Sequence, residues 1–412
     1  MTTFNSPHWL SDDQIAEIGI EKNHYEMYRR YHYQQAFGVG KWYDKLGDLT
    51  FRTTFVRLEP AEVAAILRVH SSIIRRDLLL RNSSINNDEL SEIQVSSQDN
   101  DILATLERKI QSHIDGLDSD GVFIKLNTRS PKDVFINSTD DLYRVTTLMN
   151  SFETFLREER PNETLDTLER QFTSREVMGA FVKANTFCMR VVQASDAIDL
   201  LLESTRVAED LSRVADFGLD KVVASVVVRE WNENIVHRNH MEFRGFVYQN
   251  QLNAVSQYDD ITFYPDIYSN KEDIGDRILE FFNEKIRDKL SSIESYVIDF
   301  FVDDNEIFVI ELNPFHNGAG ACLFSWRENR ELFMNGPYEF RVVEASHPDP
   351  IQYLSSFWER KLKSYVHEDD LPVDRQALEE EDEDKRKNYI IFGLVGVCVV
   401  GALATYFAKN KQ

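Results

Sequence analysis

Short apolar runs bounded by turn residues alternate along this chain with segments whose apolar residues recur every three to four positions. The second pattern is typical of amphipathic helices. One predicted helix starts at Pro60, which suits a first turn, and continues to about Arg81; another spans 274–290. The predicted strands are 50–58, 121–127, 187–192, 221–231, 241–249, 251–257, 296–302 and 307–312. The pattern therefore predicts an α+β fold.

Two pairs of these strands are separated by very few residues, which predicts antiparallel hairpins. Asn250 alone lies between the strands 241–249 and 251–257, and asparagine suits a tight turn. The last two strands flank Asp303, Asp304 and Asn305. We expect these three residues to form the second loop.

Two polar segments interrupt this pattern. Residues 82–101 are rich in Ser, Asn, Asp and Glu with little periodicity, and we expect a mobile surface insertion there, followed by a short helix over 102–113. The acidic run 379–384 is typical of a solvated linker.

Residues 389–408 contain no charged side chain and, as a helix, are long enough to cross the hydrocarbon core of a bilayer. Tyr389 and Tyr406 lie near the ends, and lysine and arginine flank both sides. Because few residues follow, we predict a single-pass tail anchor. The N-terminus lacks the features of a secretory signal, so the body should face the cytosol, on the endoplasmic reticulum or the mitochondrial outer membrane.

Composition narrows the choice of partners. The formal net charge of -24 argues against direct binding to nucleic acid. Cys188, Cys322 and Cys398 cannot all pair, and their spacing matches no metal motif, so we expect no disulfide.

The last hairpin carries the candidate chemistry. Glu311 and Asn313 are two residues apart and share one face of a strand. With a three-residue loop, Asp299 lies diagonal to Glu311 on that same face, whereas a loop of even length would separate them. Such oxygen ligands suit magnesium held together with substrate phosphates. The alternative is that these are surface residues of an ordinary hairpin.

A wider set of residues carries a resemblance. The segment 309–315, followed by 323–326, and the upstream segments 226–231 and 241–247 are similar, in order and at compatible spacing, to the cell division cycle protein 123 family. Weaker similarity extends the match to about 35–345. That family implies an ATP-grasp fold, in which two α+β lobes with antiparallel sheets clamp ATP and magnesium.

The resemblance implies roles for individual residues. Lys125 would reach the nucleotide phosphates, Arg244 would neutralise phosphate charge, and the strand ending at Trp231 would meet adenine through its backbone. Metal ligands would be Asp299, Glu311 and Asn313. The implied cofactor-binding set is Lys125, Arg229, Glu230, Trp231, Arg244, Asp299, Glu311 and Asn313. Taken singly, each cation could instead be an exposed residue or part of a structural ion pair.

The chain departs from the family at several positions. Glu230 stands where the family has a basic residue, Thr128 where it has tryptophan, and Glu311 where it has aspartate. These departures put phosphate affinity or partner choice in doubt, whereas a longer carboxylate still suits a metal.

Three functional hypotheses follow. The first is a membrane-tethered, ATP- and magnesium-binding assembly chaperone whose implied partners are the subunits of translation initiation factor 2. The second is an ATP-dependent ligase or phosphotransferase, and the third is an interaction module at a membrane surface that uses no nucleotide. The predicted organisation is a helical extension over 1–34, an ATP-grasp-like domain over 35–345, a helical segment with the acidic linker over 346–388, and the transmembrane anchor over 389–408.

Overall fold

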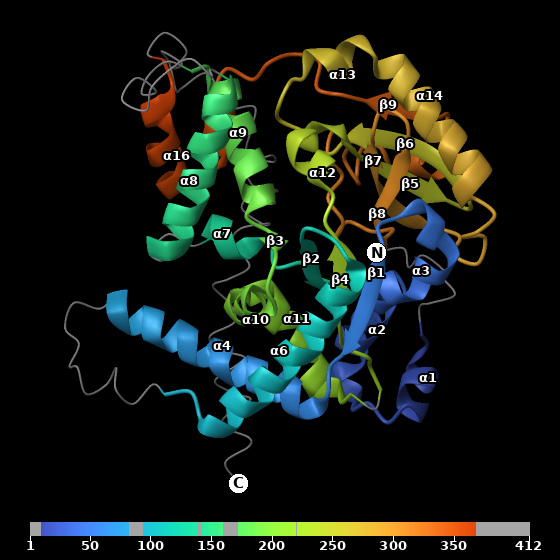
Figure 1. The fold of residues 1–412 in the computed structure, drawn as a ribbon. Helices are drawn as coiled ribbons and strands as arrows, with labels where there is room; N and C mark the ends of the chain where they lie inside the picture. The colour runs from blue at the N-terminus through green and yellow to red at the C-terminus, as the bar shows by residue number, and fades with distance from the viewer. Residues whose placement is uncertain (1–9, 82–93, 138–141, 160–171, 220, 368–412) are drawn as a thin grey trace.

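Two β-sheets organise the structure, a computed structural model that describes residues 10–81, 94–137, 142–159, 172–219 and 221–367 (Figure 1). The four-stranded sheet has the order β1-β4-β2-β3 and is antiparallel throughout. The five-stranded sheet has the order β8-β7-β5-β6-β9, and only the β6–β9 pair is parallel. The strands are β1 (Thr53–Arg57), β2 (Val122–Leu126), β3 (Arg190–Val191), β4 (Ser225–Glu230), β5 (Glu242–Tyr248), β6 (Gln251–Gln257), β7 (Tyr296–Val302), β8 (Ile307–Pro314) and β9 (Glu339–Arg341).

Helices surround both sheets. In Figure 1, α4, α6, α10 and α11 gather beside the four-stranded sheet, and α13 and α14 lie along the outer side of the five-stranded sheet. The described helices are α1 (Asp12–Glu17), α2 (Tyr25–Gln35), α3 (Val39–Leu46), α4 (Pro60–Arg81), α6 (Ser97–Leu117), α7 (Asp133–Asn137), α8 (Leu142–Glu159), α9 (Ser174–Phe187), α10 (Ala194–Glu203), α11 (Thr205–Phe217), α12 (Glu233–His237), α13 (Pro265–Ser269), α14 (Lys271–Phe281), α15 (Arg330–Asn335) and α16 (Ser356–Leu362).

Strand β4 connects two hydrophobic cores because its alternate residues face opposite ways. Val226 and Val228 are buried in the core that the helices build on one face of the four-stranded sheet. Val227 is buried in the other core, which belongs to the five-stranded sheet and includes Phe300 and Ile278. The same alternation therefore directs odd-numbered residues of β4 towards the five-stranded sheet.

The predicted strands and helices are largely confirmed. The helix over 60–81 is α4, but the predicted helix over 274–290 is divided into α14 and a π-helical turn over Phe282–Ile286. Helix α6 begins at Ser97, earlier than predicted, because the Ser96 hydroxyl accepts a hydrogen bond from the backbone N–H of Asp99 and caps the helix. Of the rest of the predicted insertion, residues 94–96 lead into this helix, and 82–93 lie outside the described residues.

The first hairpin is confirmed, although its loop is one residue longer than predicted. Val247 pairs with Leu252 and Tyr248 with Gln251, which leaves a two-residue loop. Both loop residues have positive φ, 48° at Gln249 and 62° at Asn250. This backbone is that of a type I′ turn, for which asparagine is well suited.

Segments predicted to flank the main domain also contribute to its core. Tyr28 packs edge-on against Phe217 of α11, with ring centroids 5.0 Å apart. Trp358 of α16 is fully buried, and its indole N–H donates to the carbonyl oxygen of Ile136. The ends of the predicted domain, at 35 and 345, therefore do not coincide with the limits of the packed core.

The predicted transmembrane helix requires a correction. In the part of the chain that the structure describes, no helix has the length and apolar character needed to span a bilayer. The longest, α4, carries several charged residues along its length, among them Glu62, Arg68 and Arg75. The predicted span over 389–408 lies outside the described residues. The fold class is accordingly a mixed α/β fold, with no transmembrane helix among the described residues, and the tail-anchored membrane localisation is not supported.

Candidate functional site

Strand alternation brings two cations of the four-stranded sheet to its face towards the second core. Lys125 of β2 pairs with Val227 of β4, and Phe123 pairs with Arg229. Paired residues project from the same face, so Lys125, Val227 and Arg229 lie on one side of this sheet. Lys125 and Arg229 are both buried, at 4% exposure each.

The five-stranded sheet presents a matching row of polar residues across three strands. Arg244 of β5 pairs with Asp299 of β7, which in turn pairs with Glu311 of β8. Asn313 lies two residues beyond Glu311 and so shares its face. The sheet therefore gathers both predicted carboxylates, the amide and the arginine, as the sequence predicted.

Asp299 and Glu311 come together by a different route from the predicted one. Val302 pairs with Ile307, so the loop comprises four residues, closed by the N–H of Asp303 donating to the carbonyl oxygen of Glu306. In a regular ladder, a four-residue loop would pair Asp299 with Ile310. Glu311 would then lie on the opposite face of the sheet from Asp299. A β-bulge shifts the register so that Asp299 pairs directly with Glu311. The predicted three-residue loop is wrong, and the bulge restores the shared face.

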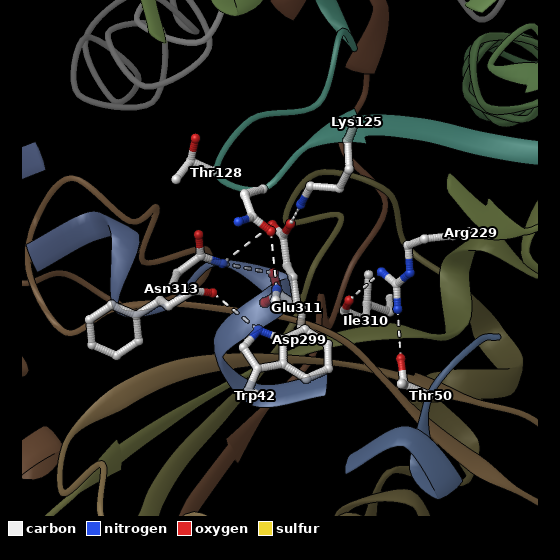
Figure 2. A network of polar contacts seen from close by, with 12 residues as sticks. Trp42, Thr50, Lys125, Thr128, Arg229, Asp299, Ile310, Glu311 and Asn313 are labelled. Atoms are coloured by element: carbon white, nitrogen blue, oxygen red, sulfur yellow. Dashed lines mark hydrogen bonds and ion pairs between the residues drawn. The ribbon is translucent and has the colours of Figure 1, made fainter. Parts of the chain in front are cut away.

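Figure 2 shows how these side chains meet. The Lys125 ammonium donates to Glu311 Oε2 at 2.8 Å, which links the two sheets. The Asn313 amide nitrogen lies 3.3 Å from Glu311 Oε1 and 3.4 Å from Asp299 Oδ2. Arg244 binds both oxygens of Asp299 at 2.7 Å. The result is a single network of opposite charges, in which Glu311 alone among the charged groups keeps a quarter of its side chain exposed, at 26%.

Arg229 lies at the edge of this network and contacts the backbone instead of the carboxylates. One terminal nitrogen donates to the carbonyl oxygen of Ile310 and the other to Thr50 Oγ1, each at 2.6 Å (Figure 2). Its Nε has no hydrogen-bond partner among the described residues.

Two of the predicted nucleotide-binding residues are not brought into the network. Glu230 forms a two-point ion pair with Arg52, and its backbone N–H donates to the Arg52 carbonyl oxygen. The backbone N–H of Trp231 donates to Gly121 and its indole N–H to Glu233. Both backbone N–H groups are therefore paired within the protein, and the predicted contact of this backbone with adenine stays a prediction.

Three residues near the network, Lys132, Tyr258 and Glu242, had no role in the sequence prediction. Lys132 is exposed, and its ammonium lies 5.7 Å from the centre of the Tyr258 ring. Arg244 contacts the same ring at 4.8 Å. Burial raises the pKa of Glu242, the first residue of β5, to about 7. Lys132 belongs to a segment that carries the family resemblance, which was the one available signal.

Charge and burial act in opposite directions on the two carboxylates. Burial raises the pKa of Asp299, although Arg244 opposes this shift. Burial would also raise the pKa of Glu311, but the positive charges of Lys125 and Lys132 hold it well below its usual range. Glu311 is therefore held in its ionised form and, unlike Asp299, is reachable from solvent.

The donor set suits magnesium in type but is already partly occupied by protein cations. Magnesium is commonly held by one or two carboxylates, with waters and phosphates completing the shell. Glu311, Asn313 and Asp299 offer such oxygens, and each carboxylate retains lone pairs beyond those used by its cation. Within the described ranges, no group of three or more His, Cys, Asp and Glu side chains could hold a metal by itself. A metal here would depend on ligands from a bound phosphate.

Comparison with known proteins shows which family this chain resembles. Residues 179–374 match the family model described as D123. Over these residues the chain is similar to the D123 family. This outcome agrees with the resemblance to cell division cycle protein 123, although not with the tail-anchored form.

Several individual proteins are also similar to this chain. The translation initiation factor eIF2 assembly protein of Dictyostelium discoideum is 38% identical over 104 residues, which span 25% of this chain and 26% of that protein. The protein of the same name from Xenopus laevis is 26% identical over 316 residues, 72% of this chain and 78% of that protein. The structure of Cdc123 from Schizosaccharomyces pombe aligns with a TM-score of 0.47 at 19% identity, over 76% of this chain and 98% of that chain.

Proposed function

We propose that this protein binds ATP together with magnesium at the network between the two sheets, and that it takes part in assembling translation initiation factor 2. The second part rests on the name shared by its relatives, eIF2 assembly protein. The first rests on one observation: Glu311 lies opposite Asp299, next to Asn313, and faces Lys125 from the other sheet.

In this proposal, each residue has a stated part. Glu311 and Asn313 hold the metal, with Asp299 kept in place by Arg244 as the buried third ligand. Lys125 moves from Glu311 to a phosphate oxygen, and the exposed Lys132 supplies a second positive charge. Magnesium, when bound, neutralises phosphate charge that these two lysines cannot balance alone. Because Lys125 and Glu311 belong to different sheets, a bound nucleotide would fix the sheets relative to each other.

Calorimetric titration of the full chain with ATP, with and without magnesium, tests the nucleotide site. We expect magnesium-dependent binding that weakens by more than about tenfold in Glu311→Gln and in Asn313→Leu, since losing a charge-assisted contact costs about 1.5–3 kcal/mol. Glu306→Gln, an exposed glutamate of the same hairpin, is the matched control and should bind normally. Equal affinity in all variants would contradict the proposal.

Co-purification tests the assembly role. The full chain should retain subunits of initiation factor 2 when ATP and magnesium are present, and lose them in Glu311→Gln. No retention by the intact protein would remove the assembly role and leave the nucleotide site to be judged separately.

A second candidate is an interaction module that uses no nucleotide. It is favoured by the closed ion pairs, because Lys125 and Arg244 already neutralise Glu311 and Asp299 without any ligand. This candidate predicts no heat on ATP addition, together with unchanged retention of subunits by Glu311→Gln.

A further inference from the structure

The β-bulge that creates the candidate site is held from the other sheet. Arg229 of β4 donates to the carbonyl oxygen of Ile310, the residue that the register shift leaves unpaired. The same guanidinium donates to Thr50 Oγ1, which itself donates to the carbonyl oxygen of Val309 at 2.6 Å. Two successive carbonyl groups of β8 are thus tied to one arginine, directly and through one hydroxyl; Figure 2 shows the contacts of Arg229 with Ile310 and Thr50.

A bulge at this position needs such support. β8 is an edge strand that pairs only with β7. The carbonyl group of a bulged residue in β8 therefore has no second strand to donate a hydrogen bond to it. A buried carbonyl without a partner is costly. If the bulge closed into a regular ladder, Ile310 would pair with Asp299, and Glu311 would move to the other face of the sheet.

Burying the Arg229 guanidinium carries a large free-energy cost. Its side chain is nearly inaccessible, and no carboxylate among the described residues forms an ion pair with it. Its guanidinium packs over the Phe51 ring at 4.9 Å. Burial lowers the pKa of Arg229 to about 10, and the nearby charge of Glu311 is the largest influence that opposes this shift. A cation in such surroundings is retained where its hydrogen bonds have a function.

We infer that Arg229 is a positioning residue, which holds the Ile310 bulge so that Glu311 lies opposite Asp299. It does this instead of contacting the nucleotide, since both of its terminal nitrogens bind protein oxygens. The inference deepens the proposed function and rests on it where magnesium binding is concerned. The placement of Glu311 by the bulge is a separate claim that needs no ligand.

Titration with magnesium and ATP separates this role from the alternatives. In Arg229→Met, we expect the magnesium affinity measured with ATP present to fall by about 10- to 100-fold, as for residues that orient metal ligands. The affinity for ATP without magnesium should change little, and Arg229→Lys should recover part of the loss because it retains a donor. Equal weakening of both affinities would overturn the inference, because that result indicates general damage or direct contact with ATP.

Thr50→Val provides a milder variant in case Arg229→Met does not fold. It removes the hydroxyl between Arg229 and the Val309 carbonyl but leaves the arginine in place. We expect a smaller loss of magnesium affinity in the same direction. An unchanged affinity in a correctly folded Thr50→Val protein would count against the inference.

Deletion of Ile310 gives the sharpest test. The deletion leaves a regular ladder in which Asp299 still pairs with Glu311, and β8 has no other strand to disturb. Arg229→Met should then cost little magnesium affinity in the deleted chain, although it costs much in the intact one. An equal loss in both backgrounds would refute the positioning role.

Amide hydrogen exchange separates failure of this inference from failure of the proposed function. If the intact chain binds no ATP, the nucleotide proposal fails, and Arg229 is judged by exchange over β8. Faster exchange at the Glu311 amide in Arg229→Met, absent when Ile310 is deleted, would still support the positioning role. Unchanged exchange in the intact chain would overturn it.

Discussion

Arg244→Met should strongly destabilise the protein because it leaves a charge buried without its partner. Arg244 and Asp299 contact each other through two hydrogen bonds of 2.7 Å, and their side chains are 6% and 1% exposed. Solvent screening is therefore slight. Breaking a buried pair of this kind costs about 3–5 kcal/mol. We expect a loss of that size in the free energy of unfolding at neutral pH.

The effect should depend on pH with a definite sign. Burial raises the pKa of Asp299, and removing Arg244 removes the main influence that opposes this shift. A carboxyl group whose folded-state pKa is raised destabilises the fold fully above that pKa, and the cost disappears as the pH falls below the unfolded-state pKa. The destabilisation by Arg244→Met should therefore shrink as the pH falls from neutral towards the ordinary aspartate range.

Urea unfolding followed by tryptophan fluorescence measures both effects. Arg238→Met is the matched control, since Arg238 pairs at 2.6 Å with Asp303 in more exposed surroundings, and it should cost less than about 1 kcal/mol. The double variant Arg244→Met with Asp299→Leu should recover most of the loss. If Arg244→Met costs no more than Arg238→Met, or if its cost does not change with pH, the reasoning is refuted.

Two further predictions concern packing and turn geometry. Phe333 stacks on Phe246 with centroids 4.3 Å apart and is almost fully buried, so Phe333→Ala should cost about 3–5 kcal/mol in thermal or urea unfolding, and Phe333→Leu much less. Similar costs for the two variants would contradict this account. Asn250→Ala should cost about 1–2 kcal/mol because φ is 62° there, whereas Asn250→Gly should be tolerated; equal stability of the two would refute the turn argument.

Local pattern in the sequence was enough to predict the strands and several of the site residues. Alternation along a strand fixes which residues share a face, so Glu311 and Asn313 could be placed together from their spacing alone. The Asn250 turn was equally local, because a left-handed backbone favours asparagine at the residue itself. Such features depend on neighbours within a few positions.

Other features were decided by contacts between distant residues. The sequence indicated a three-residue loop, but register in this hairpin depends on a bulge whose carbonyl is bound by Arg229, 81 residues away in the chain. Arg229 was predicted to bind the nucleotide, and Lys132 was given no role, for the same reason. Spacing along the chain does not reveal contacts between residues of different sheets. The predicted membrane helix came from a segment outside the described residues, so tertiary structure did not support it.

The sequence by itself thus determined the strands, the face shared by Glu311 and Asn313, and the family resemblance, because each arises from order and spacing along the chain. Tertiary structure alone decided that Asp299 faces Glu311, that Lys125 bridges the two sheets, and which charges neutralise one another. The physical reason is that hydrogen bonding and burial are satisfied in three dimensions, so a carbonyl left unpaired in one strand selects its partner from another sheet.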